Sequence, residues 1–513
     1  MNNAEPLRAL LGARFVDERE RLQRYEIPER GEPGHTDCAL LPASEAELQR
    51  LLRLCNELGQ KLVVSAGRTG LVESQRPEGE AVLSLEKLSR PLRFTLADGR
   101  AFDFVEGLKN EGAADALAQW WRGLNQPELA ESRLEVQAGI AVDAVNEILR
   151  PLNLMWPMEM GSTSAATVGA CVSNASAGAN AVCYGTAAHL CETAWGFWAD
   201  GSEAGPCQAV AWNAPAPDKL AVDSASVQPA WGLVGSQGLF GVVTRARLRT
   251  YALPAQREAV LLPVDGMPEA MRVLGVARES FPGAIEEFEF MSRQSLELVR
   301  AHLGAAFRWP FEGEVGAEKI EAPFYLLLQV KSQDAEVDLA GALYDLVNGI
   351  LEWPPERIGY APLPVLKKLR HSITESSNAR MRVLGGGRLS FDTATPVKVF
   401  GDYLAALERE VSAAFPGVEV VAFGHAGVGG AHLHLLGTKE QPVKTHAAAL
   451  VKLVFDITLR YGGTFSAEHG IGPKWAAEFQ ARAPENLKAA LKAEKNRRDP
   501  GGILNPRSFG LLA

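Results

Sequence analysis

The chain has 513 residues, more than one hydrophobic core usually supports, so we expect two or three domains. Its formal net charge of −10 at pH 7 argues against binding of nucleic acid, because such binding requires a clustered excess of Lys and Arg. The six cysteines form no CxxC pair, so we expect reduced thiols and no structural disulfide.

The N-terminal 30 residues carry scattered charges and no apolar signal region, and no stretch of the sequence approaches the length of a membrane-spanning helix. We therefore expect a cytoplasmic protein without a transmembrane segment. Peripheral association with the inner membrane stays open, because it requires only a surface patch.

The first predicted elements are a helix, a strand, a glycine-bearing loop and a second strand. Residues 43–59 have Ser44 and Glu47 at the spacing of a capping box, apolar positions at helical spacing and a terminal glycine. Short β-rich runs cover 61–65 and 81–85. The loop after the first run suits a pyrophosphate, because glycine lets backbone N–H groups approach closely. Taken alone, it is equally compatible with a surface turn.

The middle of the chain contains a predicted insertion over 94–133, which includes an Ala- and Trp-rich helix over 113–124 and to which we assign no function. A strand over 134–139 and an amphipathic helix over 142–149 follow. Residues 161–178 then have almost exclusively small side chains with many hydroxyls. Such a run favours a backbone that lies against a flat ligand, since close helix packing would require small residues at regular spacing.

A domain boundary is expected near Pro254, with alternating strand and helix patterns after it. Helical periodicity covers 267–279, and strand patterns cover 260–263, 284–290 and 324–330. The predicted fold class is α+β. The expected division is an N-terminal extension over 1–34, a first domain over 35–252, and a second domain over 253–513 that ends in a helical segment.

Histidines gather in the C-terminal part of the chain. The segment from Gly424 places His425 and His432 across a glycine loop, and an extended chain puts His434 on the same face as His432. A second segment brings Glu468 and His469 into a glycine-bounded turn. Two histidines plus a carboxylate form a recurrent site for catalytic Zn²⁺ or a related ion. The alternative is that each histidine is hydrogen-bonded separately within a strand.

The glycine-rich segments resemble a known flavin-binding domain. The order of Ala66–Val72, 167–178, Tyr184 with Gly185, and 235–244 is similar to the FAD-binding domain of the vanillyl-alcohol oxidase and p-cresol methylhydroxylase type. The two histidine segments and the ending 499–506 resemble the C-terminal domain of FAD-linked D-lactate, D-2-hydroxyglutarate and glycolate dehydrogenases, whose patterns read GHxGDGNxH and EHGIG.

The resemblance implies non-covalent FAD, because Arg68 occupies the place where some members attach the flavin through a histidine. The implied cofactor contacts lie in both small-residue loops and at a few later positions. They are Ser65, Ala66, Gly67, Arg68, Thr69, Gly70, Leu71, Gly161, Ser162, Thr167, Gly169, Ser173, Asn174, Gly178, Tyr184, Gly238, Val243 and Asn505.

The same resemblance makes His425, His432 and Glu468 ligands of a divalent metal, with zinc as the expected ion, and makes His469 the catalytic base. One departure concerns the metal. The family Asp-Gly-Asn between the histidines is replaced by Val428-Gly-Gly, which removes a carboxylate of the kind that orients metal ligands.

The implied substrate contacts are Arg370 and Thr374, which correspond to the carboxylate-binding Arg and Thr of the family. His434 stands where the hydroxyglutarate enzymes have a substrate-contacting Asn, and Ser390 stands where they have a Lys. Arg388 lies on the same strand face as Ser390 and is placed to supply the missing charge.

The function implied is oxidation of a D-2-hydroxy acid, such as D-lactate or D-2-hydroxyglutarate, to the 2-oxo acid by hydride transfer to flavin. Electrons would pass to electron-transfer flavoprotein, a quinone or a cytochrome, and a homodimer is expected. The alternatives are an FAD-binding subunit of a glycolate oxidase-like complex, an FAD oxidase of another alcohol, and a metallohydrolase.

Overall fold

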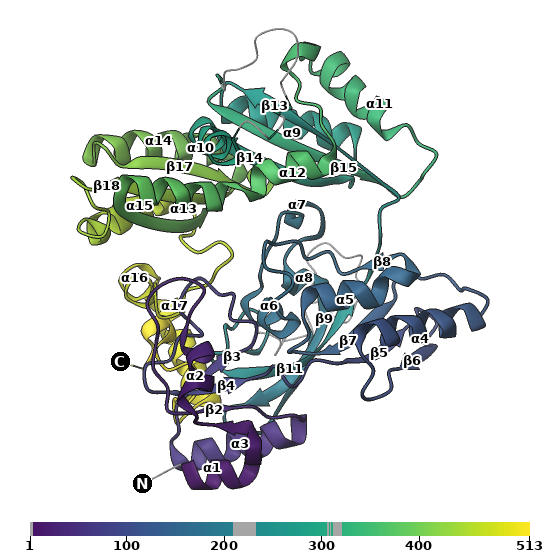
Figure 1. The fold of residues 1–513 in the computed structure, drawn as a ribbon, viewed down its shortest axis with the longest axis vertical. Helices are drawn as coiled ribbons and strands as arrows, with labels where there is room; N and C mark the ends of the chain where they lie inside the picture. Colours follow the sequence, from purple (N-terminus) through teal and green to yellow (C-terminus); the bar gives the residue numbers. More distant parts are fainter. Residues whose placement is uncertain (1–3, 209–231, 305–306, 308, 311–320, 513) are drawn as a thin grey trace. The chain divides into compact units, whose positions relative to one another are not determined.

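The computed structural model describes residues 4–208, 232–304, 307, 309–310 and 321–512, and Figure 1 shows the elements that they form. The chain divides into two compact units. The first unit comprises Met1–Gly178, Gly185–Leu253 and Glu468–Ala513, and the second comprises Ala179–Tyr184 and Pro254–Ala467. The chain thus leaves the first unit after residue 253 and returns to it at Glu468.

A four-stranded sheet of the first unit carries the first predicted loop. Its order is β1-β2-β4-β3, and β4 pairs in parallel with both β2 and β3. Helix α3 (Glu45–Leu58) precedes β3; the Ser44 side chain accepts a hydrogen bond from the Glu47 N–H, and Gly59 ends the helix at a φ of 64°. The predicted helix is therefore confirmed at both ends. The strands are β1 (Phe15–Val16), β2 (Ala39–Leu40), β3 (Leu62–Ser65) and β4 (Ala81–Ser84).

The described part of the expected N-terminal extension packs into this first unit. Helix α1 (Ala4–Leu11) and a single 3₁₀ turn lead to β1, in which Phe15 pairs with Leu40 of β2. Leu22 and Tyr25 of α2 (Arg19–Glu26) are buried in one cluster with apolar side chains of β2 and β4. Removing these side chains from water ties the segment to the sheet.

The first unit also contains a six-stranded antiparallel sheet, in the order β10-β9-β11-β7-β5-β6, and a two-stranded sheet of β12 and β8. Residues 94–133 contribute β6 and α4 beside it, with Trp120 of α4 edge-on to Phe94. The predicted helix over 142–149 is confirmed as α5. The elements are β5 (Pro91–Thr95), β6 (Ala101–Asp103), α4 (Asn110–Gly123), β7 (Arg133–Gln137), α5 (Val142–Leu149), β8 (Leu154–Met155), α6 (Val168–Asn174), α8 (Ala187–Leu190), β9 (Cys191–Trp198), β10 (Glu203–Gln208), β11 (Gly241–Arg249) and β12 (Tyr251–Ala252).

The second unit is built on a six-stranded antiparallel sheet in the order β13-β15-β14-β17-β18-β16. Side chains of α10, α12 and α13 share a buried cluster with one face of the sheet, and Phe400 of α14 packs on Phe290 of the other face. The α+β fold class is confirmed. The elements are α7 (Ala181–Tyr184), β13 (Gln256–Val264), α9 (Met267–Ser280), β14 (Ile285–Ser292), α10 (Arg293–Leu303), β15 (Phe324–Ser332), α11 (Leu339–Tyr344), α12 (Leu363–His371), α13 (Ile373–Leu384), β16 (Gly385–Ala394), α14 (Phe400–Ala414), β17 (Glu419–Gly424), β18 (Gly430–Thr438) and α15 (Ala447–Arg460).

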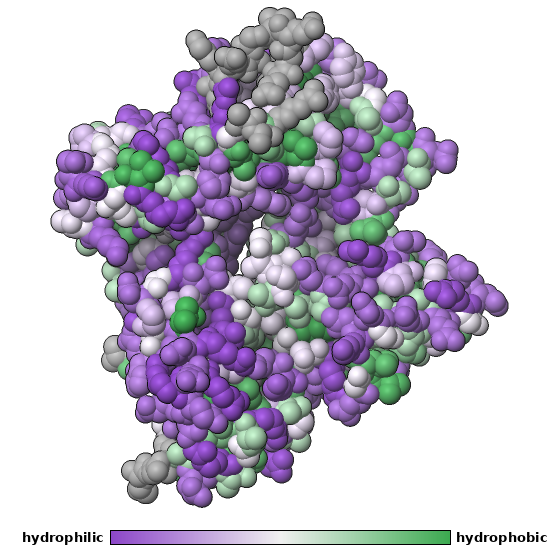
Figure 2. Space-filling model, in the orientation of Figure 1, coloured by the Kyte–Doolittle hydropathy of each residue, from purple (hydrophilic) through white to green (hydrophobic). Residues whose placement is uncertain are grey.

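The predicted C-terminal helical segment is confirmed as α16 (Ala476–Arg482) and α17 (Glu485–Arg498), which belong to the first unit. All six cysteines are free thiols, as expected. Within the described part of the chain, no helix is both long and apolar enough to cross a membrane. Hydrophilic residues cover most of the face drawn in Figure 2, and hydrophobic residues form small separate groups on it.

Candidate functional site

A tight hairpin in the second unit brings His425 and His432 together. Strand β17 ends at Gly424, whose φ of 148° a residue with a side chain rarely adopts. The backbones of His425 and Gly430 then hydrogen-bond to each other in both directions, and β18 begins. This closed turn sets the two imidazole rings 5.2 Å apart between centroids.

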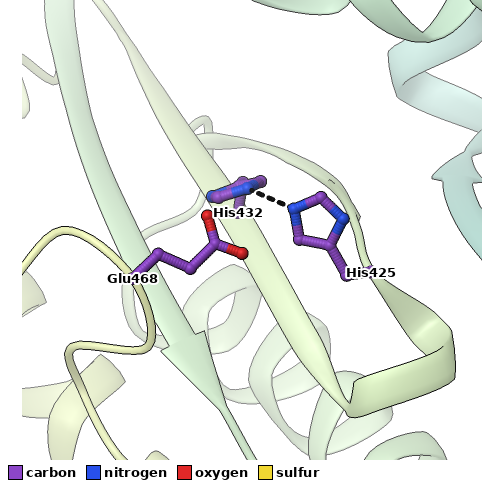
Figure 3. A group of neighbouring side chains, drawn as sticks. All are labelled: His425, His432 and Glu468. Carbon is purple, nitrogen blue, oxygen red and sulfur yellow. Dashed lines mark hydrogen bonds between the residues drawn. The ribbon is translucent and has the colours of Figure 1, made fainter. Parts of the chain in front are cut away.

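Glu468 completes a group of three side chains that could hold a metal ion, with ligand atoms all within 4.8 Å of one another. The strand-like bridges of Thr464 to Ala394 and of Ser466 to Asp392 lead the chain to this position. Figure 3 shows the Glu468 carboxylate directed toward the two rings.

The spacing of the two imidazole nitrogens fits a metal. The Nε2 atoms of His425 and His432 lie 3.3 Å apart. With the usual zinc–nitrogen bond length, two ligands of a tetrahedral site lie about 3.3 Å apart. The residue types, the spacing and the carboxylate therefore fit a divalent cation of the zinc type.

A buried carboxylate that the sequence did not reveal holds His425. The Nδ1 of His425 lies 2.5 Å from Oε1 of Glu289, and Nε of Arg370 donates to Oε2 of Glu289 over 2.7 Å. Burial alone would raise the pKa of Glu289, but the charges and hydrogen bonds of His425 and Arg370 hold it below the ordinary value. The ionised carboxylate thus favours a proton on Nδ1 and leaves the Nε2 lone pair for a metal.

Glu289 thus places a carboxylate on His425, whereas the loop at Val428 has none. Its position follows from strand pairing, because Phe290 of β14 lies opposite Gly424 of β17. The one available sequence signal was that Glu287 and Glu289 alternate with apolar residues in a predicted strand. A second carboxylate, that of Asp392, lies cross-strand from His432, with 3.9 Å between its Oδ1 and Nδ1 of that ring.

The structure brings three of the expected functional side chains around Phe423. The Arg370 guanidinium lies over its ring at 4.7 Å, and the rings of His432 and His434 lie 5.4 and 5.0 Å from it. His434 is thus next to the candidate metal group without belonging to it.

The other expected substrate residues lie on neighbouring elements. Thr374 is half-buried in the first turn of α13, three residues after the end of α12, which carries Arg370. Ser390 of β16 pairs with His434 of β18, and Arg388 lies two residues away on the same strand. The paired strands β16 and β18 therefore carry both side chains that depart from the substrate-binding pattern of the hydroxyglutarate enzymes.

The two small-residue stretches of the first unit meet at Gly67. A Cβ atom at Gly67 would lie 1.9 Å from the carbonyl oxygen of Ala165, so only glycine allows this approach. The hydroxyls of Ser65 and Thr167 are buried, and within the described part of the chain neither has a hydrogen-bond partner. Because buried hydroxyls normally have partners, the two stretches fit a polar ligand such as a nucleotide.

The remaining residues that were expected to contact the cofactor differ in their contacts and burial. The left-handed Arg68 places its guanidinium 5.4 Å from the Tyr25 ring, and Gly169 allows α6 to approach Ala138 of the β7 end. Gly178 allows a similar approach to the Glu159 backbone. Ala66, Thr69, Gly70 and Leu71 are half-buried, as are Ser162, Ser173 and Asn174, whereas Gly161 is exposed and Val243 is buried in β11.

Gln237, a residue that the sequence did not single out, connects several of these segments. Its backbone N–H donates to the Ser173 carbonyl over 2.8 Å, and its Oε1 accepts from the N–H groups of Ile471 and Gly472 over 2.8 and 3.4 Å. The Nδ2 of Asn505 donates to the carbonyls of Gln237 and Gly238. The turn that follows His469 is therefore fixed by a side-chain amide within the first unit.

Tyr184 belongs to the second unit, where its hydroxyl accepts a hydrogen bond from Nζ of Lys331 over 2.5 Å and lies 3.3 Å from Oε1 of Glu286. Burial and the neighbouring charge of Glu286 raise the pKa of this phenol. The described contacts thus place Tyr184 in a buried polar cluster, and its contact with a cofactor stays a prediction.

Several solved structures share this fold, including those of two enzymes. p-Cresol methylhydroxylase with substrate bound aligns with a TM-score of 0.67 at 14% identity, over 99% of this chain and 96% of that chain. Alkyldihydroxyacetonephosphate synthase aligns with a TM-score of 0.65 at 14% identity, over 99% and 84%. At such low identity the likeness defines the class of fold, which is the p-cresol methylhydroxylase type that the sequence predicted.

Family descriptions extend this result. The FAD binding domain family matches residues 36–202, and the family of FAD linked oxidases, C-terminal domain, matches residues 253–509, half of the chain. The chain belongs to the FAD-linked oxidases.

Named relatives cover most of the chain. D-2-hydroxyglutarate dehydrogenase of Xanthomonas citri pv. viticola is 26% identical over 91% of this chain and 87% of its own length. A putative mitochondrial D-lactate dehydrogenase of Schizosaccharomyces pombe is 23% identical over 93% and 82%, and mitochondrial D-2-hydroxyglutarate dehydrogenase of Danio rerio is 23% identical over 97% and 83%.

Proposed function

We propose that the chain is an FAD-dependent dehydrogenase that oxidises a small D-2-hydroxy acid, of the D-lactate or D-2-hydroxyglutarate type, to the 2-oxo acid. The observation that carries the proposal is the grouping of His425, His432 and Glu468 at ligand distance in a chain with an FAD binding domain. The names of its relatives support the substrate class.

FAD, when bound, supplies the acceptor for the hydride that leaves C2 of the substrate. The residues that would hold it are those of the two small-residue stretches, where Ser65 and Thr167 offer hydroxyls without protein partners in the described part of the chain. The first loop has Arg68 where a covalent attachment would require a histidine, so we propose that FAD is bound non-covalently.

A divalent ion, with zinc as the proposed species, would lower the pKa of the substrate hydroxyl. His425, His432 and Glu468 would hold it, leaving at least one position open for the hydroxyl. Glu289 keeps the His425 ring oriented for this role.

Arg370 is the proposed anchor for the substrate carboxylate. Its Nε donates to Glu289, so its two terminal nitrogens remain as a planar pair of donors, and neither has an ion-pair partner among the described residues. Thr374, Arg388 and His434 are proposed to complete the binding of the substrate. Fixing the carboxylate orients C2, which raises the fraction of reactive encounters.

His469 is the proposed base. It accepts the hydroxyl proton while C2 releases its hydrogen with both electrons, so that the C–O single bond becomes a carbonyl. Its position directly after Glu468 brings the base close to the group that would bind the hydroxyl. The electron pair of the C2–H bond leaves with the hydride, and the electron pair of the O–H bond forms the second carbon–oxygen bond.

The two electrons must then leave the protein. We propose electron-transfer flavoprotein, a quinone or a cytochrome as the acceptor, a homodimer as the assembled form, and a cytoplasmic location that allows peripheral membrane contact. A subunit of a larger oxidase complex is the competing assignment, and activity of the isolated chain with a dye acceptor separates the two.

An anaerobic screen of D- and L-2-hydroxy acids tests the proposal. We expect a D-2-hydroxy acid to bleach the visible flavin absorbance and to yield the 2-oxo acid, whereas its L enantiomer should leave the spectrum unchanged. A protein that binds FAD but reacts with no 2-hydroxy acid, or with L enantiomers alone, contradicts the proposal.

A further inference from the structure

Strand β14 carries an unusual concentration of buried acids. Glu286, Glu287 and Glu289 are each 1% exposed. Glu287 and Glu289 share the sheet face that packs against α12, and each pairs with a cation of that helix: Lys367 lies 2.7 Å from Glu287, and Arg370 lies 2.7 Å from Glu289. Burying a charged group costs solvation free energy, and pairing with an opposite charge recovers only part of it. Three buried acids on one strand are therefore more readily explained by function than by stability.

Glu289 differs from Glu287 because both of its oxygens are used by candidate site residues. Oε1 accepts from the His425 ring, and Oε2 accepts from Nε of Arg370. One carboxylate therefore joins a candidate metal ligand to the candidate anchor of the substrate carboxylate. Glu287, by contrast, is paired with Lys367, a side chain that the proposed function does not use.

We propose that Glu289 is a positioning residue that sets metal affinity and substrate affinity together, an inference that rests on the proposed function. A carboxylate on Nδ1 fixes the plane of the His425 ring and makes Nε2 a better donor to a metal. The same carboxylate accepts a hydrogen bond from Nε of Arg370, so that the two terminal nitrogens of this guanidinium are directed to the substrate carboxylate. Both sites depend on one side chain.

The position of Glu289 also explains how the loop can lack an acid. Val428-Gly429-Gly430 contains no carboxylate, and Gly429 lies so near Thr395 that a Cβ would be 2.1 Å from its carbonyl oxygen. The carboxylate that orients His425 is instead supplied by the neighbouring strand.

The test compares Glu289→Gln with Glu287→Gln. The control is closely matched, since both residues lie on β14, are equally buried and pair with α12. Zinc is removed from each protein, and zinc affinity is measured by competition with a chromophoric chelator, without substrate. We expect Glu289→Gln to lower zinc affinity by about 10–100-fold and Glu287→Gln to leave it unchanged.

Two further quantities are measured: the KM for the best D-2-hydroxy acid, and the dissociation constant of its 2-oxo product. Product binding is monitored through changes in the flavin spectrum. Glu289→Gln should raise both the KM and the product dissociation constant, and Glu287→Gln should change neither. FAD content and thermal unfolding show whether each variant is folded. If Glu289→Gln does not fold, Glu289→Asp, which keeps the charge, should give intermediate zinc affinity.

The outcomes separate the two proposals. Equal losses of zinc affinity in both Gln variants, or no loss in Glu289→Gln, overturn the positioning role. Failure of the unsubstituted protein to bind zinc, cobalt or manganese overturns that role and the metal centre together. Normal zinc binding without oxidation of any hydroxy acid overturns the proposed function alone and leaves the effect of Glu289 on the metal measurable.

Discussion

The two histidine-bearing segments are held in place by different means. In the segment 425–434, the side chains are fixed by other side chains, chiefly the Glu289 carboxylate on His425 and the aromatic ring of Phe423 beside His432 and His434. In the segment 468–472, the backbone is fixed, because Gln237 accepts hydrogen bonds from the N–H groups of Ile471 and Gly472.

This difference predicts different sensitivities. The first segment should respond to changes of charge at constant size, since its geometry depends on a carboxylate. The second should respond to added bulk, since Gly470 and Gly472 have φ of 85° and 51° and each has a neighbouring atom where a Cβ would stand. Three predictions concern these two segments, and a fourth concerns the buried Glu286 of β14.

The largest effect is expected from His469→Ala. Loss of the proposed base should lower the rate of flavin reduction by about 10²–10⁴-fold without changing zinc content, because His469 is not in the candidate metal group. Stopped-flow absorbance with a D-2-hydroxy acid measures the rate of flavin reduction, and metal analysis measures the zinc content. His446→Ala is the control, since that histidine lies beside Phe415. An unchanged rate in His469→Ala contradicts its role.

His432→Ala should remove the metal and also reduce the rate. A catalytic divalent ion typically contributes several kcal/mol, which is on the order of 10²–10³ in rate. FAD content should remain that of the unsubstituted protein, since the binding stretches lie in the first unit. Chelator treatment of the unsubstituted protein should reproduce the loss, and added zinc should reverse it. Full activity after complete removal of metal would exclude a catalytic ion.

Gly470→Ala tests the second segment. The left-handed φ costs a non-glycine residue about 1–2 kcal/mol, and the new Cβ would also lie 2.6 Å from Oε1 of Gln237. Gly462→Ala is the matched control, because Gly462 has a φ of 69° and nothing within 4 Å of a Cβ. Gly470→Ala should lower the thermal unfolding midpoint and the rate of flavin reduction more than Gly462→Ala does. Equal effects of the two substitutions would show that Gln237 does not define the turn.

The smallest expected effect is a pH dependence of the second unit. Burial would raise the pKa of Glu286, but the hydrogen bond and charge of Arg257 lower it below the ordinary value. A depressed folded pKa contributes stability above the unfolded pKa of about 4.3, and this stability is lost as pH falls through the folded value. The difference in unfolding midpoint between the unsubstituted protein and Glu286→Gln should therefore shrink on acidification. A difference that stays constant contradicts the shift.

Local patterns in the sequence predicted the elements well. The capping residue Ser44 and the periodicity of 142–149 depend only on neighbouring residues, and both helices form as expected. The hairpin of His425 and His432 was also visible, because a glycine loop between two histidines brings them together. These features require no knowledge of distant contacts.

Contacts between segments that are distant in the chain could not be predicted from the sequence. Glu289 reaches His425 only through the pairing of β14 with β17, across more than one hundred residues. Gln237 has a left-handed backbone with a φ of 54°, which cannot be predicted from the residue type because glutamine rarely adopts it. The N-terminal segment around Phe15 was expected as an extension, although it pairs with β2. In each case the tertiary partner decides the role.

The boundary between the units falls between Ala467 and Glu468, so the proposed metal ligand and the proposed base, His469, are consecutive residues on its far side. Consecutive Cα atoms are separated by about 3.8 Å across a trans peptide bond. A substitution that displaces the Glu468 backbone would therefore displace His469 as well, so the proposed ligand and the proposed proton acceptor cannot be repositioned independently.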